Sequence, residues 1–235
     1  MIAIISDIHG NLPALESVLE DMQNYDIKKI ISLGDVSGYY PFINEVIELL
    51  EINDVVNLIG NHDRYIIDNT ECPRSNSANV CLDYQKSVIT HKNKIWLQKS
   101  QVKYEIDNIS MVHGGWIDNE DEYIYKVTDD YFKKLSQNFF FCGHTHIQKH
   151  IVLKNNKEFI NPGSVGQPRD GNPMSAYCIF DTLLEKIILR RVTYDIDKVV
   201  FKMKELNFEE YYSSNLYDGT RIGGKLNSII YEKNK

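Results

Sequence analysis

Short apolar runs alternate with helical patterns in the N-terminal part of the chain. Residues 1–6, 29–33 and 54–59 are apolar runs of strand length, each followed by a polar loop. Apolar positions then recur at helical spacing after Pro13 and again from residue 43, and a shorter helical stretch follows GNHD. The apolar faces of the first two predicted helices consist of Leu12, Leu15, Val18, Leu19 and Met22, and of Ile43, Val46, Ile47 and Leu50. Strands joined by helices of this length predict right-handed crossovers and a buried parallel sheet.

The pattern changes in the second part of the chain. Residues 76–100 mix polar and apolar positions at helical spacing and are predicted to be helical. Short strand patterns follow, several of them joined by hairpin-type turns at Asp107-Asn108 and Asn155-Asn156, so this half is expected to be mixed or antiparallel. The strands predicted here are 103–105, 109–112, 139–142, 147–153, 158–160, 176–180 and 186–191.

The end of the chain and its composition bear on domain organisation. A last helix is predicted at about residues 197–206, and the tail from residue 209, rich in Tyr, Ser and Gly, fits no element pattern. The 235 residues are 43% hydrophobic and 25% charged, an ordinary globular balance without a break that suggests a linker. We therefore expect one domain over residues 1–235, with the tail unassigned. The four scattered cysteines are expected to be reduced thiols.

Charge and hydropathy disfavour some classes of partner. The formal net charge is −7 and the pI about 5.5, so there is no general basic field for a nucleic-acid backbone. No window approaches the roughly 20 apolar residues of a membrane span, and the first residues do not form a signal-peptide pattern. We expect a cytoplasmic protein that binds neither nucleic acid nor membrane. Its oligomeric state does not follow from the sequence.

Residues suited to bind metals are concentrated in loops that follow predicted strands. Such positions line the crevice at the carboxyl ends of the strands of an α/β sheet. Residues i and i+2 of an extended or turn segment project to the same side and can hold one ion between them. Glycines adjoin most of these clusters and permit a close approach of the backbone. The clusters are Asp7 with His9, Asp35, Asn61 with His62 and Asp63, His113, and His144 with His146.

The chemistry of these side chains favours a site for two divalent ions. Ions bound about 3.5–4 Å apart need a bridging group that offsets their repulsion, and the carboxylate of Asp35 is the natural bridge. Imidazole, carboxylate and amide ligands without thiolate suit Mn, Fe, Zn or Ni, and we expect Mn²⁺. The predicted ligands are Asp7, His9, Asp35, Asn61, His113, His144 and His146.

Five motifs occur in an order that resembles a known family. DIHG, GD, GNHD, a lone His after a strand, and GHTH resemble the complete signature of the calcineurin-like metallophosphoesterases, over residues 7–146. GDVSGYYPFINEVIELL and NPGSVGQPRDGNP resemble a bacterial and archaeal subgroup of small YfcE-like phosphoesterases. The resemblance implies an α/β fold, a four-layer α/β/β/α sandwich of two mixed sheets flanked by helices. It also implies one ion held by Asp7, His9, Asp35 and His146, and a second held by Asp35, Asn61, His113 and His144.

The resemblance further implies a mechanism. A metal-bound hydroxide attacks phosphorus in line, with Asp35 as the shared catalytic ligand. His62 would be a proton donor or phosphate contact rather than a metal ligand, and Asn61 would lie beside the substrate. Arg169, in the Gly- and Pro-rich loop 162–173, is a candidate phosphate contact; the alternative is a solvated loop arginine.

One departure from the superfamily pattern narrows the substrate. Protein phosphatases of the superfamily carry GDxxDRG, whose second Asp orients the catalytic His and whose Arg grips the phosphate, whereas this chain reads GDVSGYY. That disfavours phosphoprotein substrates and leaves open which group orients His62. Asp63 is adjacent, but it is also suited to cap the following helix.

Other polar and aromatic residues have ordinary structural interpretations. The acidic run 118–122 lacks the spacing of a calcium loop and is expected to be a solvated loop. His91 and His150 lie outside the motifs and are expected to be structural. Three aromatic residues follow ligand-bearing loops and either pack in the core or stack on a base or aryl group: Tyr39, Tyr40 and Trp116.

Three functions remain to be compared. The leading one is metal-dependent hydrolysis of a phosphodiester or phosphomonoester of a small molecule. The alternative in the same class is a hydrolase of dinucleoside polyphosphates such as diadenosine tetraphosphate. The alternative of another class is a catalytically inactive scaffold, as in a retromer subunit of the superfamily; all seven predicted ligands and His62 are present here, which disfavours it. The expected partner is a small-molecule phosphoester or nucleotide.

Overall fold

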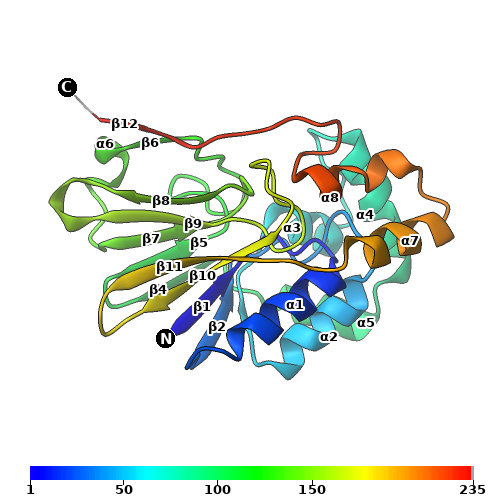
Figure 1. Ribbon diagram of the computed structural model, residues 1–235, viewed down its shortest axis with the longest axis horizontal. Coiled ribbons are helices and arrows are strands. Elements are labelled where there is room, and N and C mark those ends of the chain that lie inside the picture. Colours follow the sequence, from blue (N-terminus) through cyan, green and yellow to red (C-terminus); the bar gives the residue numbers. More distant parts are fainter. Residues whose placement is uncertain (234–235) are drawn as a thin grey trace.

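Two five-stranded sheets pack face to face in the computed structural model, which describes residues 1–233 (Figure 1). The first sheet has the order β11 (Lys186–Val192), β10 (Ser175–Asp181), β1 (Ile2–Ile5), β2 (Lys29–Ser32) and β3 (Val56–Asn57). Strands β1, β2 and β3 are parallel, which confirms the prediction for the N-terminal strands. The late strands β10 and β11 join them antiparallel, so the first sheet is mixed.

The second sheet repeats this arrangement. Its order is β4 (Lys103–Ile106), β5 (Ile109–Val112), β7 (Phe139–Cys142), β9 (Glu158–Pro162) and β8 (Gln148–Val152). Central strands β5, β7 and β9 are parallel, and the edge strands β4 and β8 are antiparallel to their neighbours. The mixed pairing predicted for this half is therefore confirmed, although its centre is parallel.

Alternate residues of the central strands face opposite sides of each sheet. In β1, Ile4 belongs to the core between the sheets, whereas Ile5 faces the helices. In β7, Phe139 and Phe141 enter the same core between the sheets, whereas Phe140 faces away from it. Because both faces of these strands are buried, their sequences are continuous apolar runs.

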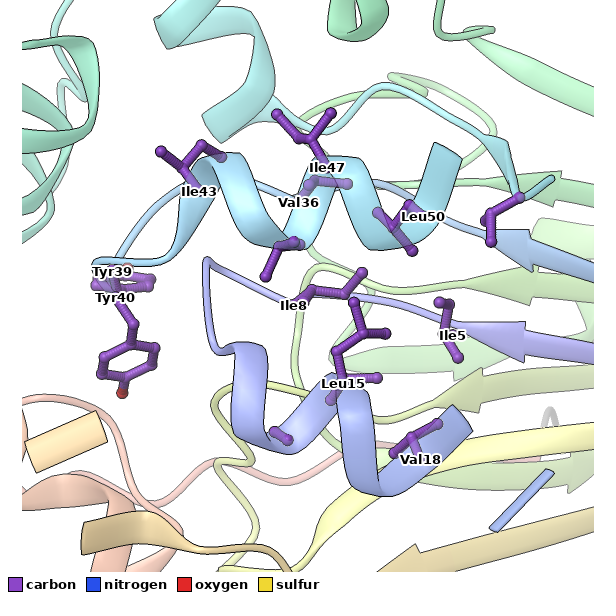
Figure 2. Close-up of a cluster of buried hydrophobic side chains, with 14 of the residues drawn as sticks. Ile5, Ile8, Leu15, Val18, Val36, Tyr39, Tyr40, Ile43, Ile47 and Leu50 are labelled. Atoms are coloured by element: carbon purple, nitrogen blue, oxygen red, sulfur yellow. The ribbon is translucent and has the colours of Figure 1, made fainter. Parts of the chain in front are cut away.

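Helices cover the outer face of the first sheet (Figure 1). They are α1 (Leu12–Met22), α2 (Ile43–Ile52), α4 (Asn76–Val88), α5 (His91–Gln98) and α7 (Ile196–Glu205). Figure 2 shows apolar side chains of the first two helices gathered over the end of β1, namely Leu15, Val18, Ile43, Ile47 and Leu50 with Ile5 and Ile8. The predicted apolar faces of these helices are thus the buried ones.

A thinner layer covers the outer face of the second sheet. It consists of the short helix α6 (Asp129–Phe132) and of β6 (Lys126–Thr128) paired in parallel with β12 (Ile230–Glu232). Phe132 is buried and packs against Phe140 of β7 at a ring-centroid distance of 4.9 Å. Helices, two mixed sheets and this outer layer confirm the predicted α/β/β/α sandwich.

Two segments differ from the sequence-based prediction. The helix expected at 76–100 is two helices, because Ile89 is extended (φ −60°, ψ 129°) and Thr90 caps α5 by accepting from the N–H of Asn93. The unassigned tail forms the short elements η2 (Glu210–Tyr212) and α8 (Asn215–Asp218) and then crosses to the second sheet as β12 (Figure 1). No helix within residues 1–233 is long and apolar enough to cross a membrane.

Candidate metal centre

The predicted ligands meet where the two sheets present the carboxyl ends of their parallel strands. The N–H of His144 donates to Asp7 Oδ2 (3.0 Å), so the loops after β7 and β1 are tied together at this point. All seven side chains are buried. The first sheet and the start of α3 (Asn61–Asp68) supply Asp7, His9, Asp35 and Asn61, and the second sheet supplies His113, His144 and His146.

Five of the seven residues have a left-handed backbone conformation. The φ angles of Asp7, His9, Asp35, His144 and His146 lie between 53° and 62°. Residues with a Cβ atom rarely adopt this region, which costs on the order of 1–3 kcal/mol each, and such residues cluster at functional sites. Asp7 and His9 reach the same cluster of ligand atoms, as their i, i+2 spacing predicts, whereas His144 and His146 reach different clusters, so the expectation of one shared ion is wrong for that pair.

Asp7, His9 and His146 form the first cluster of candidate ligand atoms. His146 Nε2 lies 3.1 Å from His9 Nε2 and 3.2 Å from Asp7 Oδ1. His9 Nδ1 donates to the carbonyl of Ser37 (2.7 Å), and His146 Nδ1 donates to the carbonyl of Gln167 (2.6 Å). Because a carbonyl only accepts, both protons are on Nδ1, and each Nε2 presents a lone pair to the other.

Asp35, His113 and His144 form the second cluster, with the amide of Asn61 beside it. His113 Nε2 lies 3.1 Å from His144 Nδ1, 3.3 Å from Asn61 Oδ1 and 3.4 Å from Asp35 Oδ2. His113 Nδ1 donates to the carbonyl of Leu33 (3.0 Å), so its Nε2 lone pair also faces the cluster. Asp35 Oδ2 is 3.8 Å from His9 Nε2 as well, which puts this carboxylate between the two clusters.

The donor sets fit divalent cations. Two facing Nε2 lone pairs repel each other, and Asp7 Oδ1 is buried with no hydrogen-bond partner in the described chain. Ligand atoms at about 2.0–2.2 Å from one ion lie roughly 3.0–3.5 Å apart, which matches most of these separations. Burial lowers the pKa values of His9, His144 and His146 well below the usual range, so their lone pairs are free.

A positive charge is favoured between the clusters. Burial opposes a charge on His113, but the carboxylate of Asp35 raises the pKa of His113 to about 9. A proton and a metal ion compete for such a position, since both interact with the same lone pair and carboxylate.

His62 lies against the clusters. Its ring packs among those of His9, Tyr39 and Tyr65, at centroid distances of 5.0, 5.1 and 5.8 Å. The backbone N–H of His62 donates to Asp35 Oδ1 (2.8 Å). The ring nitrogen Nδ1 is buried without a hydrogen-bond partner among residues 1–233. Neighbouring rings, rather than a carboxylate, therefore orient His62.

Asp63 is the cap of α3 and a tie between two site loops. Its Oδ2 accepts from the N–H of Gly60 (3.2 Å), and its Oδ1 accepts from the N–H and hydroxyl of Ser37 (2.9 and 2.8 Å). The carbonyl of Ser37 in turn holds His9. Of the two roles considered for Asp63, the structure supports capping.

Gly38 stands where the protein phosphatases have the second Asp of GDxxDRG. A Cβ atom at Gly38 would lie 2.2 Å from His9 Nδ1 and 3.0 Å from His62 Nδ1, and φ is +140°. An aspartate does not fit here unless His9 moves. The phosphatase arrangement is therefore incompatible with this loop.

Arg169 is buried, so the solvated alternative is wrong. It is 2% exposed, and its Nε and Nη2 donate to Gln167 Oε1 (2.9 and 2.5 Å). Its guanidinium lies 5.5 Å from the centroid of the Tyr39 ring, which itself packs on the ring of His9 at 4.8 Å. Arg169 is thus linked to the site through Tyr39.

The acidic run 118–122 is more than a solvated loop, and that prediction is corrected. Glu120 makes a bidentate pair with Arg64, at 2.7 and 2.9 Å, and Asp121 makes one with Arg74. Asp121 Oδ1 also lies 3.5 Å from His144 Nε2. The two residues of each Arg–acid pair are 47 or more positions apart in sequence, so no local sequence pattern could have revealed the pairs.

The remaining candidates are structural. The hydroxyl of Tyr40 accepts from Gln167 Nε2 (3.0 Å), and Trp116 packs edge-on against Phe140 at 5.1 Å. These two aromatic residues pack, whereas Tyr39 lines the site. His91 is exposed at the start of α5, and His150 in β8 pairs with Glu158.

The chain is similar to known proteins in both sequence and structure. The calcineurin-like phosphoesterase superfamily domain matches residues 1–184. The chain is 36% identical over 246 residues to an uncharacterized protein of Methanocaldococcus jannaschii, covering 93% of this chain and 98% of that protein. The crystal structure of a metallophosphoesterase from Sphaerobacter thermophilus is similar with a TM-score of 0.81 and 29% identity, covering 93% and 98% of the two chains. A hypothetical protein of Pyrococcus horikoshii shares the fold, with a TM-score of 0.79, 21% identity and coverages of 93% and 99%.

Proposed function

Because the chain belongs to the calcineurin-like phosphoesterase superfamily, we propose that it hydrolyses phosphodiester or phosphomonoester bonds of small molecules with two divalent ions. The observation that supports this most is the pair of adjacent buried clusters, in which Asp35 of the second cluster also lies 3.8 Å from His9 of the first. One ion would be held by Asp7, His9, Asp35 and His146, and the other by Asp35, Asn61, His113 and His144. Nitrogen and oxygen donors without thiolate are compatible with Mn²⁺, the ion we propose, and also with Fe, Zn or Ni.

The residues divide the chemistry among them. Bound ions supply charge that stabilises phosphoryl oxygens and makes a water-derived nucleophile available at neutral pH. Asp35 would offset the repulsion between two bound ions, and its Oδ1 accepts a hydrogen bond from the backbone N–H of His62. His62 would donate a proton or hydrogen bond to an oxygen of the substrate from its ring, which packs against His9. Asn61 offers its oxygen to an ion and its amide N–H groups to the substrate.

A small-molecule substrate is favoured over a phosphoprotein. The loop lacks both partners of the phosphatase motif, since Gly38 and Tyr39 stand in the places of its Asp and Arg. Arg169 lies over Tyr39 and is the cation available to contact a phosphate from that direction.

Gly60 offers a test of the ligand geometry. Its backbone (φ −100°, ψ 172°) suits alanine, but an added Cβ would lie 2.1 Å from Asp35 Oδ1. Gly60→Ala is expected to lower Mn²⁺ affinity about 10- to 100-fold, as displacement of a supporting group does at metal sites. Titration calorimetry with Mn²⁺ measures this. Ser87→Ala, at an exposed position of α4, is the control, and equal affinity of both variants would contradict the geometry.

Turnover of bis-p-nitrophenyl phosphate tests the proposed activity. Protein treated with EDTA should be inactive, and Mn²⁺ should restore release of p-nitrophenol at neutral pH, because the ions supply both charge and nucleophile. Chromatography of products from diadenosine tetraphosphate, assayed in parallel, identifies a dinucleoside polyphosphate hydrolase. No turnover of either compound with Mn²⁺, Fe²⁺, Zn²⁺ or Ni²⁺ would instead indicate the inactive scaffold.

A further inference from the structure

Two arginines differ from the other four of the chain in their partners. Within residues 1–233, neither Arg169 nor Arg221 forms an ion pair with a carboxylate. The other four arginines each pair with one: Arg64 with Glu120, Arg74 with Asp121, Arg190 with Asp21 and Arg191 with Asp170. Arginine is the side chain best suited to bind an anionic group through parallel hydrogen bonds. An arginine without a carboxylate partner beside a candidate active site is therefore a candidate to bind an anionic ligand.

Arg169 is the stronger of the two observations. It is 2% exposed, and buried cations are almost always paired, because desolvation of an isolated charge is costly. Its acceptor, Gln167 Oε1, is neutral, and the face of the Tyr39 ring offsets only part of the charge. The fold therefore holds a buried positive charge one aromatic ring away from His9 and His62.

Arg221 is brought to the same place by the C-terminal tail. Residues 219–227 are anchored at both ends on the loop that carries Arg169: the N–H of Gly171 donates to the carbonyl of Gly219 (3.0 Å), and the N–H of Asn227 donates to the carbonyl of Arg169 (3.2 Å). The Arg221 N–H donates to the carbonyl of Lys225 (3.1 Å), which closes the stretch into a turn. Arg221 is half-buried there.

Both arginines are near enough to Tyr125 to affect its hydroxyl group electrostatically. Burial raises the pKa of Tyr125, and the positive charges of Arg221 and Arg169 oppose that rise. The side chain of Asn227 also reaches the hydroxyl of Tyr125 (3.3 Å), which ties the tail to the loop leading into β6. The turn that carries Arg221 thus lies against the loop that carries Arg169, whose guanidinium lies over Tyr39 beside the metal centre.

Charge balance indicates what this region binds, given the proposed function. Two divalent ions, the carboxylates of Asp7 and Asp35 and a hydroxide nucleophile would together leave one positive charge, and Arg169 and Arg221 add two more. A phosphodiester carries a single negative charge, and a phosphomonoester carries about 1.5 to 2. A substrate with a further anionic group balances the site better than a simple ester does.

We propose that Arg169 and Arg221 form a second anion-binding subsite beside the metal centre, which binds an anionic group of the substrate other than the ester being hydrolysed. That the bound anion belongs to a substrate rests on the proposed function. That the two arginines bind an anion does not depend on it. Its ligand is a second phosphate or a carboxylate. The natural substrates are then phosphoesters that carry such a group near the scissile bond.

Titration calorimetry of the metal-free protein tests the subsite without turnover. Orthophosphate is the probe for a phosphate group, and malonate is the probe for a carboxylate. Wild-type protein should bind one of the two saturably. Arg169→Met should weaken that binding about 10- to 100-fold and Arg221→Gln about tenfold, since each removes charged hydrogen bonds to the anion.

Lys225→Gln is the matched control, because it removes the same charge from an exposed position of the same turn. It should bind the probe as wild type does. The inference is overturned if wild-type protein binds neither probe, or if Arg221→Gln and Lys225→Gln bind it equally well. Circular dichroism checks the fold of Arg169→Met, and Arg221→Gln alone decides if that variant does not fold. A protein that binds the probe but never turns over a phosphoester would refute the proposed function and leave the subsite standing.

Discussion

Asp35→Asn is expected to lower turnover of bis-p-nitrophenyl phosphate by at least about 10³-fold. Asp35 lies between the two clusters, with Oδ2 at 3.4 Å from His113 Nε2 and 3.8 Å from His9 Nε2. An amide of the same shape carries no charge to offset the repulsion between two ions, and loss of several kcal/mol of charge stabilisation corresponds to this factor. Steady-state kinetics at saturating Mn²⁺, with metal content by mass spectrometry, measures both consequences.

Asp54→Asn is the matched control for this variant. Asp54 shares the left-handed backbone of Asp35, with φ of 51° against 53°, but it is exposed at the end of α2. The control should keep wild-type metal content and rate, because asparagine tolerates the same backbone. If Asp35→Asn bound two ions per chain and turned over like Asp54→Asn, Asp35 would not be the bridge.

His62→Ala is expected to keep two ions per chain and to lose about 10²- to 10⁴-fold in kcat, the usual contribution of a placed proton donor. The ring of His62 faces the clusters, whereas it is the backbone N–H that holds Asp35, and alanine keeps this N–H. The variant should therefore lose rate without losing metal. Steady-state kinetics and mass spectrometry of the metal-reconstituted protein measure the rate and the metal content, as for Asp35→Asn.

The exposed His91 provides the control for His62. His91→Ala should match wild type in metal content and kcat, since this side chain lies in solvent at the start of α5. An unchanged kcat in His62→Ala would remove His62 from the reaction. Loss of metal together with rate would make His62 a ligand or a support of the ligands instead.

The sequence predicted which loops meet at the candidate site, but it did not predict the order of the strands within the sheets. In parallel strands the carboxyl ends share one edge, so Asp7 after β1 and Asp35 after β2 had to be close once those strands were assigned. The return of β10 and β11 to the first sheet was not predictable in this way. Their apolar runs are compatible with either sheet, and only the packing of the whole chain decides between them.

Long-range polar contacts were missed for a related reason. The acidic run 118–122 has the composition of a solvated loop, and its pairing with Arg64 and Arg74 depends on the approach of two halves of the fold. The tail from residue 209 has no helical or strand period, because its elements are short and β12 forms against β6. The hydrogen bonds between this tail and the loop of Arg169 likewise cannot be predicted from the local sequence pattern.

The left-handed conformation of the ligands could not be predicted from their residue types. Histidine and aspartate seldom adopt positive φ, yet His9, Asp35 and His144 do so at 53°, 53° and 62°. The cost is offset by packing and hydrogen bonds elsewhere, such as that of His144 N–H to Asp7. The gathering of five such residues in one buried centre suits a site shaped for a ligand.

Anomalous X-ray diffraction at the manganese absorption edge, from crystals grown with Mn²⁺, tests the dinuclear centre most directly. We expect two peaks roughly 3.5–4 Å apart, one beside Asp7, His9 and His146 and the other beside Asn61, His113 and His144, with Asp35 between them. A single peak, or peaks that do not contact Asp35, would contradict the two-ion site on which the proposed hydrolysis depends.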